Sequence, residues 1–200
     1  MRRSPSSLAV LAFAACGPGH VFHKDPERGC ADITLAGQED VAAAAGCTAV
    51  ESITLRTGMR LDLAPLGRLE KITGMLAVGP SVGLSELSLP RLRIAGAIKI
   101  VANGDLHGVF LPKLERVGDL EVEGNNSLSN LSAPKLAMVS GKLAIRDDPA
   151  LEVVDLTALA SAGEVVISNT PKLTLVEGAL PALRSAIPAS RPEVVTPAEP

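Results

Sequence analysis

A five-residue pattern that returns every twenty-two residues or so constrains the fold of this chain more than any other feature. Each copy has glycine first and aliphatic residues third and fifth, and the copies begin at Gly74, Gly96, Gly118, Gly141 and Gly163. The steps between them are 22, 22, 23 and 22 residues. Two shorter segments, residues 33–35 and 53–55, extend the series towards the N-terminus. This period is typical of short strands stacked in coils around one core, so the sequence predicts a mainly β solenoid with about seven short parallel strands.

Other positions repeat in each coil and complete its outline. A leucine follows each strand, at Leu84, Leu106, Leu128, Leu151 and Leu173. A corner reads Leu-Pro-Arg-Leu at residues 89–92, Leu-Pro-Lys-Leu at 111–114 and Ala-Pro-Lys-Leu at 133–136. Proline is tolerated at such a corner because it removes no N–H from the strand ladder there. Each coil is therefore expected to have three inward-pointing apolar clusters separated by turn residues.

A polar residue lies between each strand and the following leucine. These turn positions are occupied by Ser81, Asn103, Asn125, Asp148 and Thr170. Buried turn backbone demands hydrogen-bonding partners. We therefore interpret Asn103, Asn125 and Asp148 as a structural turn ladder, in preference to a ligand site.

The composition agrees with a regular aliphatic core. Of the 200 residues, 46% are hydrophobic and 20% charged, which argues against global disorder. The chain has no Trp, no Tyr and three Phe, so its core must be filled by aliphatic side chains. The net charge of −3 provides no electrostatic footprint for nucleic acid and no basic face for anionic lipid.

The coil frame, with glycine before each strand and Asn-x-x-Leu after it, resembles the receptor L-domain. This family forms the leucine-rich right-handed solenoids of insulin- and EGF-type receptor ectodomains and of fungal cell-wall proteins. The best match is residues 30–35, a short helical stretch at 38–45 and the segment 46–55, which look like the family's first strand, helix and second strand. The resemblance covers about residues 30–183. It implies a right-handed solenoid with an N-terminal capping helix and a disulfide between Cys30 and Cys47, and it is almost silent on function.

The N-terminus has the features of an export signal. Arg2 and Arg3 precede an apolar stretch at residues 8–15, which is too short to span a bilayer as a helix. Residues 13–16 resemble the lipobox of bacterial lipoproteins, which implies that Cys16 is lipidated. If Cys30 and Cys47 pair, Cys16 is the odd cysteine of three, and lipidation accounts for it. The residue after it, Gly17, favours the outer membrane by resemblance to the best-known sorting rule.

These features divide the chain into four expected parts. They are a signal peptide (residues 1–15), a linker (16–29), the solenoid (30–187) and a disordered Pro-rich tail (188–200). The alternative is ordinary signal cleavage after residues 12–14, which would release a soluble secreted protein.

The outward strand positions form our candidate binding face. It comprises Lys99, Val101, Asp119, Glu121, Glu123, Lys142, Arg146 and Glu164. The register pairs Asp119 with Lys142, Lys142 with Glu164, Lys99 with Glu121, and Glu123 with Arg146. Exposed pairs of this kind are common and weak, so a self-neutralising ladder is favoured over a charged ligand site. The face nevertheless remains the first candidate for recognition, with apolar windows at Ala77, Ala97, Val101, Ala144 and Val166.

No catalytic, metal or cofactor site is expected. His20, His23 and His107 lack suitable partners nearby in the sequence. Asp147 and Asp148 would suit calcium, but Asp148 occupies the turn ladder and no matching carboxylates recur. The sequence contains no phosphate-binding glycine loop and no nucleophile elbow. Solenoid lyases and hydrolases need clustered catalytic residues and usually rings that stack on sugars, and the strand face offers neither.

The sequence therefore favours a non-catalytic lipoprotein of a bacterial envelope that binds a protein or an envelope polymer. Its contact with the membrane would be through the N-terminal lipid alone, and nucleic acid is not an expected partner. The alternatives are a structural spacer without a specific ligand and, last, a glycan-active solenoid enzyme.

Overall fold

The computed structural model describes residues 24–25 and 29–178. The proposed signal peptide, Cys16 and the Pro-rich tail lie outside the described residues. The solenoid predicted for residues 30–187 is described as far as residue 178.

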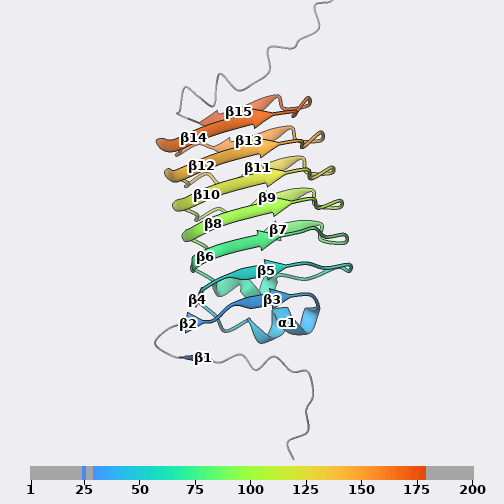
Figure 1. Ribbon diagram of the computed structural model, residues 1–200, viewed down its shortest axis with the longest axis vertical. Coiled ribbons are helices and arrows are strands. Elements are labelled where there is room, and N and C mark those ends of the chain that lie inside the picture. The colour runs from blue at the N-terminus through green and yellow to red at the C-terminus, as the bar shows by residue number, and fades with distance from the viewer. Residues whose placement is uncertain (1–23, 26–28, 179–200) are drawn as a thin grey trace, which may run out of the picture.

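The chain winds into a right-handed β-solenoid, as predicted, and the solenoid has about six turns. The long strands in Figure 1 run from left to right while successive coils rise, which is the right-handed sense. They are β6 (Lys71–Val78), β8 (Ile94–Val101), β10 (Arg116–Glu123), β12 (Met138–Arg146) and β14 (Ser161–Ser168). All are parallel and pair in this order within a ten-stranded sheet. We call its outer surface, from the repeated glycine of each strand onwards, the long-strand face.

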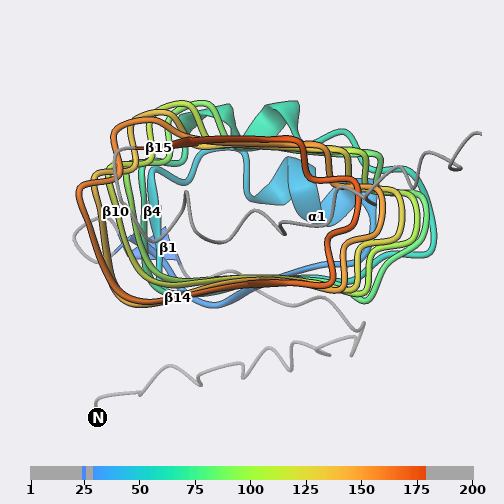
Figure 2. The same cartoon turned by 90° about the horizontal axis from the view of Figure 1, so that it is seen from above.

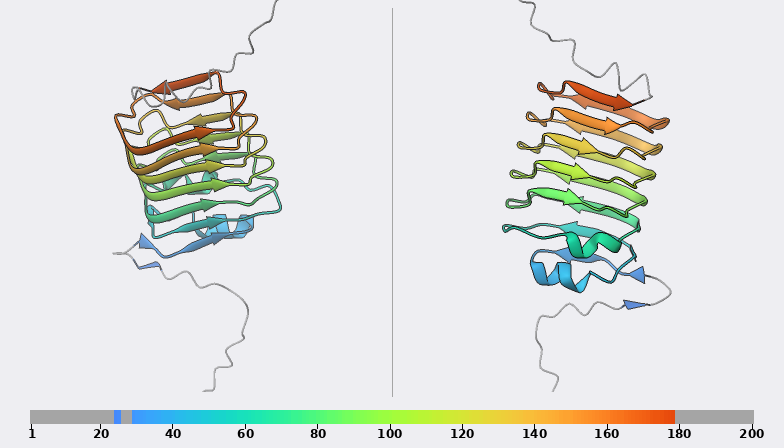
Figure 3. Two further views of the ribbon diagram at one scale, coloured as in Figure 1. Left: turned by 45° about the horizontal axis from the view of Figure 1, so that its top comes forward. Right: turned by 180° about the vertical axis from the view of Figure 1, so that it is seen from behind.

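A second, five-stranded parallel sheet forms the opposite wall, which is seen from behind in Figure 3. It consists of β7 (Glu86–Ser88), β9 (Gly108–Phe110), β11 (Asn130–Ser132), β13 (Val153–Leu156) and β15 (Leu175–Gly178). The sequence had indicated only an apolar cluster at this wall. Each of the first three strands is three residues long and buries a central residue such as Leu87. Three residues are too few for an alternating pattern to be recognised.

The repeated glycines lie within the long strands. The sequence pattern had instead suggested that they precede each strand. Each long strand bends at its glycine, and the register shifts there in three of the four long-strand pairs. A Cβ atom at Gly96 would come within 2.5 Å of the carbonyl oxygen of Gly74, and one at Gly118 would clash with the carbonyl oxygen of Gly96. Only glycine allows coils to stack this closely at the bend.

The core between the two walls is aliphatic. Leu120 and Val122 from the long-strand sheet, and Leu131 from the opposite wall, have no exposed surface. Burial of each such side chain contributes about 1.5–3 kcal/mol, largely offset by the entropy of ordering the chain. Figure 2 shows the coils superimposed along the axis, which is the arrangement of a repeat whose stability accumulates from neighbouring coils.

The first two coils differ from the others and form the N-terminal end. They contain β2 (Gly29–Cys30), which pairs with β1 (Lys24–Asp25), as well as β3 (Ile33–Leu35), β4 (Ala49–Val50) and β5 (Ile53–Leu55). Helix α1 (Gln38–Ala43) and the 3-10 helix η1 (Ala64–Arg68) follow β3 and β5. Viewed along the axis, α1 lies inside the outline of the coils, as a cap would. The predicted disulfide between Cys30 and Cys47 is confirmed and ties the two ends of the first coil together.

The turn ladder is a buried column of hydrogen bonds along one edge of the solenoid. Ser81 Oγ donates to Asn103 Oδ1 (2.6 Å), and Asn103 Nδ2 donates to Asn125 Oδ1 (2.9 Å). Asn125 Nδ2 in turn donates to Asp148 Oδ1 (3.1 Å). Asn103, Asn125 and Asp148 have no exposed surface, so each side chain is committed to its neighbours.

The ladder also satisfies backbone groups of adjacent coils. The Nδ2 of Asn125 donates to the carbonyl of Ile100 (3.0 Å), and its Oδ1 accepts the backbone N–H of Asn103 (3.1 Å). The backbone N–H of Asn125 donates to Asp148 Oδ1 (2.7 Å). These bonds are those expected of a structural column.

Asp148 is the exception in the ladder because it is a carboxyl group. Its Oδ2 is buried and has no hydrogen-bonding partner among the described residues. Burial raises the pKa of Asp148 from 3.8 to about 6, although hydrogen bonds from the backbone and side chain of Asn125 favour the ionised form. The ladder therefore contains one group whose charge changes near neutral pH.

Candidate functional site

The register of the long strands gathers the predicted binding face into one area. Lys99, Glu121 and Ala144 lie opposite one another on β8, β10 and β12. Val101, Glu123 and Arg146 form the next row. We call Lys99, Glu121, Glu123 and Arg146 the charge cluster. It contains two cations and two carboxylates, so its charges balance.

Arg146 is the centre of the charge cluster. Its Nη2 lies 2.7 Å from Glu123 Oε2 in the same row and 3.0 Å from Glu121 Oε1, which it reaches diagonally across the sheet. The arginine side chain is one-third exposed. Its Nε is buried and has no hydrogen-bonding partner among the described residues. The guanidinium is thus held in place by two carboxylates, while part of the arginine side chain stays open to solvent.

The fourth member, Lys99, completes the neutralisation of Glu121. Its Nζ lies 3.0 Å from Glu121 Oε2. The hydrogen bond from Lys99, together with the charges of Lys99 and Arg146, holds the pKa of Glu121 below its ordinary value in spite of partial burial. Glu121 is therefore an anion held between two cations.

A depression of about 240 Å³ lies over this part of the long-strand face. Its lining consists of Lys99, Asp119, Glu121, Lys142, Ala144 and Arg146. Ala144 is only 1% exposed. The expectation that Ala144 forms an open apolar window is therefore wrong, because the longer charged side chains on β10 and β12 surround this small residue.

The expected ion pair between Asp119 and Lys142 takes a different form. Asp119 Oδ1 accepts the backbone N–H of Lys142 (2.8 Å), while Lys142 Nζ lies 3.4 Å from Glu164 Oε1. The register between β10 and β12 shifts between Val117 and Leu120, next to these residues. The shift leaves the Lys142 N–H available to the carboxylate. The other three expected ion pairs are present.

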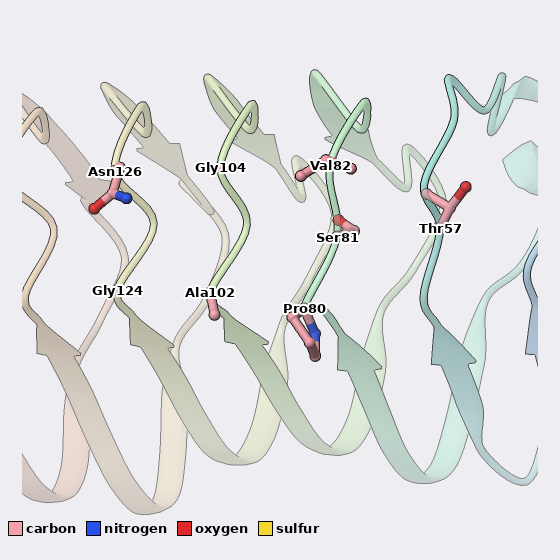
Figure 4. A pocket seen from close by; sticks show the side chains of 8 residues that line it. All are labelled: Thr57, Pro80, Ser81, Val82, Ala102, Gly104, Gly124 and Asn126. Atoms are coloured by element: carbon pink, nitrogen blue, oxygen red, sulfur yellow. The ribbon is translucent and has the colours of Figure 1, made fainter.

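A second depression, of about 380 Å³, lies at the edge where the turns meet the long strands (Figure 4). Its lining residues are Thr57, Pro80, Ser81, Val82, Ala102, Gly104, Gly124 and Asn126. None of these side chains titrates. Two hydroxyl groups are already engaged, since Thr57 Oγ1 donates to the carbonyl of Met59 and Ser81 Oγ donates to Asn103. This depression offers shape and no reactive group.

The residues considered for chemistry are scattered. His107 is exposed on the turn before β9, and His20 and His23 lie outside the described residues. Asp147 accepts a hydrogen bond from Asn169 (2.7 Å) on the surface, whereas Asp148 is buried. Within residues 24–25 and 29–178, no group of three His, Cys, Asp or Glu residues is placed to hold a metal ion.

The corner after the second sheet carries a column of cations that the sequence reasoning missed. Arg68, Arg91, Lys113 and Lys135 precede the same buried leucine position in four successive coils. The sequence signal was the third position of the corner motif, which had been considered only for its proline and leucines. The net charge of −3 conceals this column, because carboxylates elsewhere in the chain outweigh it. The expectation that the chain has no basic face is therefore wrong at this corner.

Comparison with known proteins returned no match: no family model, curated protein or solved structure matches this chain. Among the helices of the described residues, none is long and apolar enough to cross a membrane.

Proposed function

We propose that the chain is a non-catalytic binding module of a bacterial envelope that recognises a protein or an envelope polymer with its long-strand face. In this proposal a lipid on Cys16 anchors it to the membrane, and the outer membrane is the expected location. The resemblance to the receptor L-domain supports the proposal, because that family presents its solenoid outside the cell.

The observation that carries the proposal is the state of Arg146. Two carboxylates fix the guanidinium on the long-strand face, where it lines a depression, and the arginine side chain is one-third exposed. Arginine is enriched among the residues that dominate binding energy at interfaces. A pre-oriented arginine also loses little entropy when a ligand docks, which favours affinity.

A photo-crosslinking experiment in intact cells tests the proposed face. A photoreactive residue at Ala97, on the long-strand face, is expected to form a discrete adduct. The same residue at Glu86, which is exposed on the opposite sheet, is the matched control and should form none. Substituting Arg146→Ala should remove the adduct from Ala97. Equal adducts from both positions, or adducts insensitive to Arg146→Ala, would refute recognition by this face.

The absence of adducts at both positions would favour the spacer hypothesis. In that case deletion of one whole coil, residues 97–118, should impair the function of the protein in cells, because it shortens the spacer. Arg146→Ala should leave that function unchanged. Turnover of an envelope polysaccharide by the purified chain would contradict both hypotheses.

The lipid anchor is tested separately by mass spectrometry of the mature N-terminus. The expected species begins at Cys16 and carries the mass of the attached lipid. An unmodified N-terminus at residue 15 would instead establish soluble secretion.

A further inference from the structure

We infer that the basic column, Arg68, Arg91, Lys113 and Lys135, is a binding site for an acidic polysaccharide that lies along the solenoid axis. This surface is the corner after the second sheet and is separate from the charge cluster. The inference therefore does not rest on the proposed function.

The backbone holds the four cations in register. The N–H of Arg93 donates to the carbonyl of Glu70 (2.8 Å), and the N–H of Glu115 donates to the carbonyl of Arg93 (2.8 Å). Ala137 continues this series by donating to Glu115 (2.9 Å). Each cation of the column lies two residues before one of these bonded positions. Neighbouring cations are therefore one strand spacing apart, at about 4.8 Å of rise, and the column spans roughly 14 Å.

The cations of the column are exposed and unneutralised. None of the four makes an ion pair within the described part of the chain. Glu115 is paired with Arg93 (2.7 Å), and the charge of Glu70 also acts on Arg93. The corner therefore has five cations against two carboxylates and keeps a positive net charge. Glu70, Arg91, Arg93, Lys113, Glu115 and Lys135 line a depression of about 440 Å³.

The basic column differs from the long-strand face in how its cations are neutralised. On that face, cations of neighbouring coils have carboxylates beside them. At the corner, like charges lie next to one another in four successive coils, an arrangement that destabilises a sheet. An external anion with regularly spaced charges would relieve this repulsion along the whole column.

The spacing and surroundings favour an acidic polysaccharide over other polyanions. One carboxylate on each sugar of an extended chain repeats at a distance close to one coil. Phosphates of one duplex DNA strand advance by about 3.4 Å along the helix axis and wind around it, so they do not follow a straight column of coils. Single-stranded nucleic acid is usually bound with aromatic rings that stack on bases, and the chain has no Trp or Tyr. A planar membrane would meet only a narrow line of charge.

The test uses polygalacturonate oligomers as the probe and measures binding to the full chain by calorimetry. The variant Lys113→Glu/Lys135→Glu is expected to bind at least about tenfold more weakly, because two attractive contacts become repulsive. The matched control is Arg60→Glu/Lys172→Glu, which makes the same change in net charge at exposed cations outside the column. It should bind like the wild-type chain. Circular dichroism and thermal unfolding confirm that each variant is folded.

Salt and competing ligands complete the test. Raising the salt from about 50 to about 200 mM should weaken binding by roughly fiftyfold or more when all four cations engage the polymer, because binding releases counterions from it. Neutral dextran should not bind. Equal weakening by the two double variants, or unchanged binding by both, would overturn the inference. So would tighter column-dependent binding of single-stranded DNA or of vesicles containing phosphatidylglycerol, since these would assign the column to another class of partner.

Discussion

The turn ladder and the charge cluster are both polar columns built by the same coils, yet they use their side chains in opposite ways. In the ladder, Asn125 has no exposed surface and its amide bonds two backbone groups of the preceding coil. In the charge cluster, Glu121 and Arg146 are a quarter to a third exposed and bond each other. Loss of a ladder residue leaves buried backbone without partners, whereas loss of a cluster residue leaves groups that water can reach. The comparison separates buried residues that stabilise the fold from partly exposed residues that a ligand could contact.

The largest expected effect is at the centre of the ladder. Substituting Asn125→Ala removes the side-chain partners of two buried backbone groups, the N–H of Asn103 and the carbonyl of Ile100. It also removes one hydrogen bond each from Asn103 Nδ2 and Asp148 Oδ1, which keep other partners. A buried polar group left unsatisfied costs about 1–3 kcal/mol. We expect the free energy of unfolding to fall by roughly 3–5 kcal/mol, as measured by urea denaturation.

The neighbouring residue provides the control for this substitution. Asn126 is exposed at the same turn, so Asn126→Ala should change the free energy of unfolding by less than about 0.5 kcal/mol. Similar losses in the two variants would mean that the ladder contributes no more than ordinary turn residues.

The next effect concerns the one carboxyl group in the ladder. Because folding raises the pKa of Asp148 from 3.8 to about 6, the folded state binds this proton more tightly than the unfolded state. The stabilisation is complete below about pH 4 and is lost as the pH rises through 6. The total loss is about 3 kcal/mol for a shift of this size.

Substituting Asp148→Asn should abolish this pH dependence. The amide keeps an acceptor for Asn125, and its Nδ2 is available for the carbonyl of Val122, which is the register equivalent of Ile100. We expect Asp148→Asn to be more stable than the wild-type chain at pH 8 and to lose that advantage at pH 4. Unfolding free energies measured across this range give the comparison, with exposed Asp32→Asn, which is not among the groups that shift the pKa of Asp148, as the control that retains the wild-type slope. A slope unchanged in Asp148→Asn would show that Asp148 titrates normally.

The positions of the turn ladder and of the charge cluster could be predicted from the sequence, because both recur with the period of the coils. The spacing from Asn103 to Asn125 placed the ladder, and the spacing from Lys99 to Glu121 placed an ion pair. What it missed depends on contacts across coils that no local pattern records. The diagonal reach of Arg146 to Glu121, the burial of Ala144 and the raised pKa of Asp148 arise only when the coils are stacked. The second sheet was missed because its short strands carry too few residues for an alternating pattern.

The smallest expected effect on stability is at the charge cluster, although its effect on binding should be large. Substituting Arg146→Ala removes two partly exposed ion pairs, and exposed pairs contribute about 0–1 kcal/mol each. Glu121 keeps its contact with Lys99, and Glu123 remains accessible to water. Urea denaturation should therefore detect a loss of about 1 kcal/mol or less, and added salt should reduce it further because screening weakens the pairs. A double-mutant cycle with Glu123→Ala measures the coupling directly. If Arg146→Ala instead cost as much as Asn125→Ala, the cluster would belong with the ladder as a structural column, and the long-strand face would lose its claim to be a binding surface.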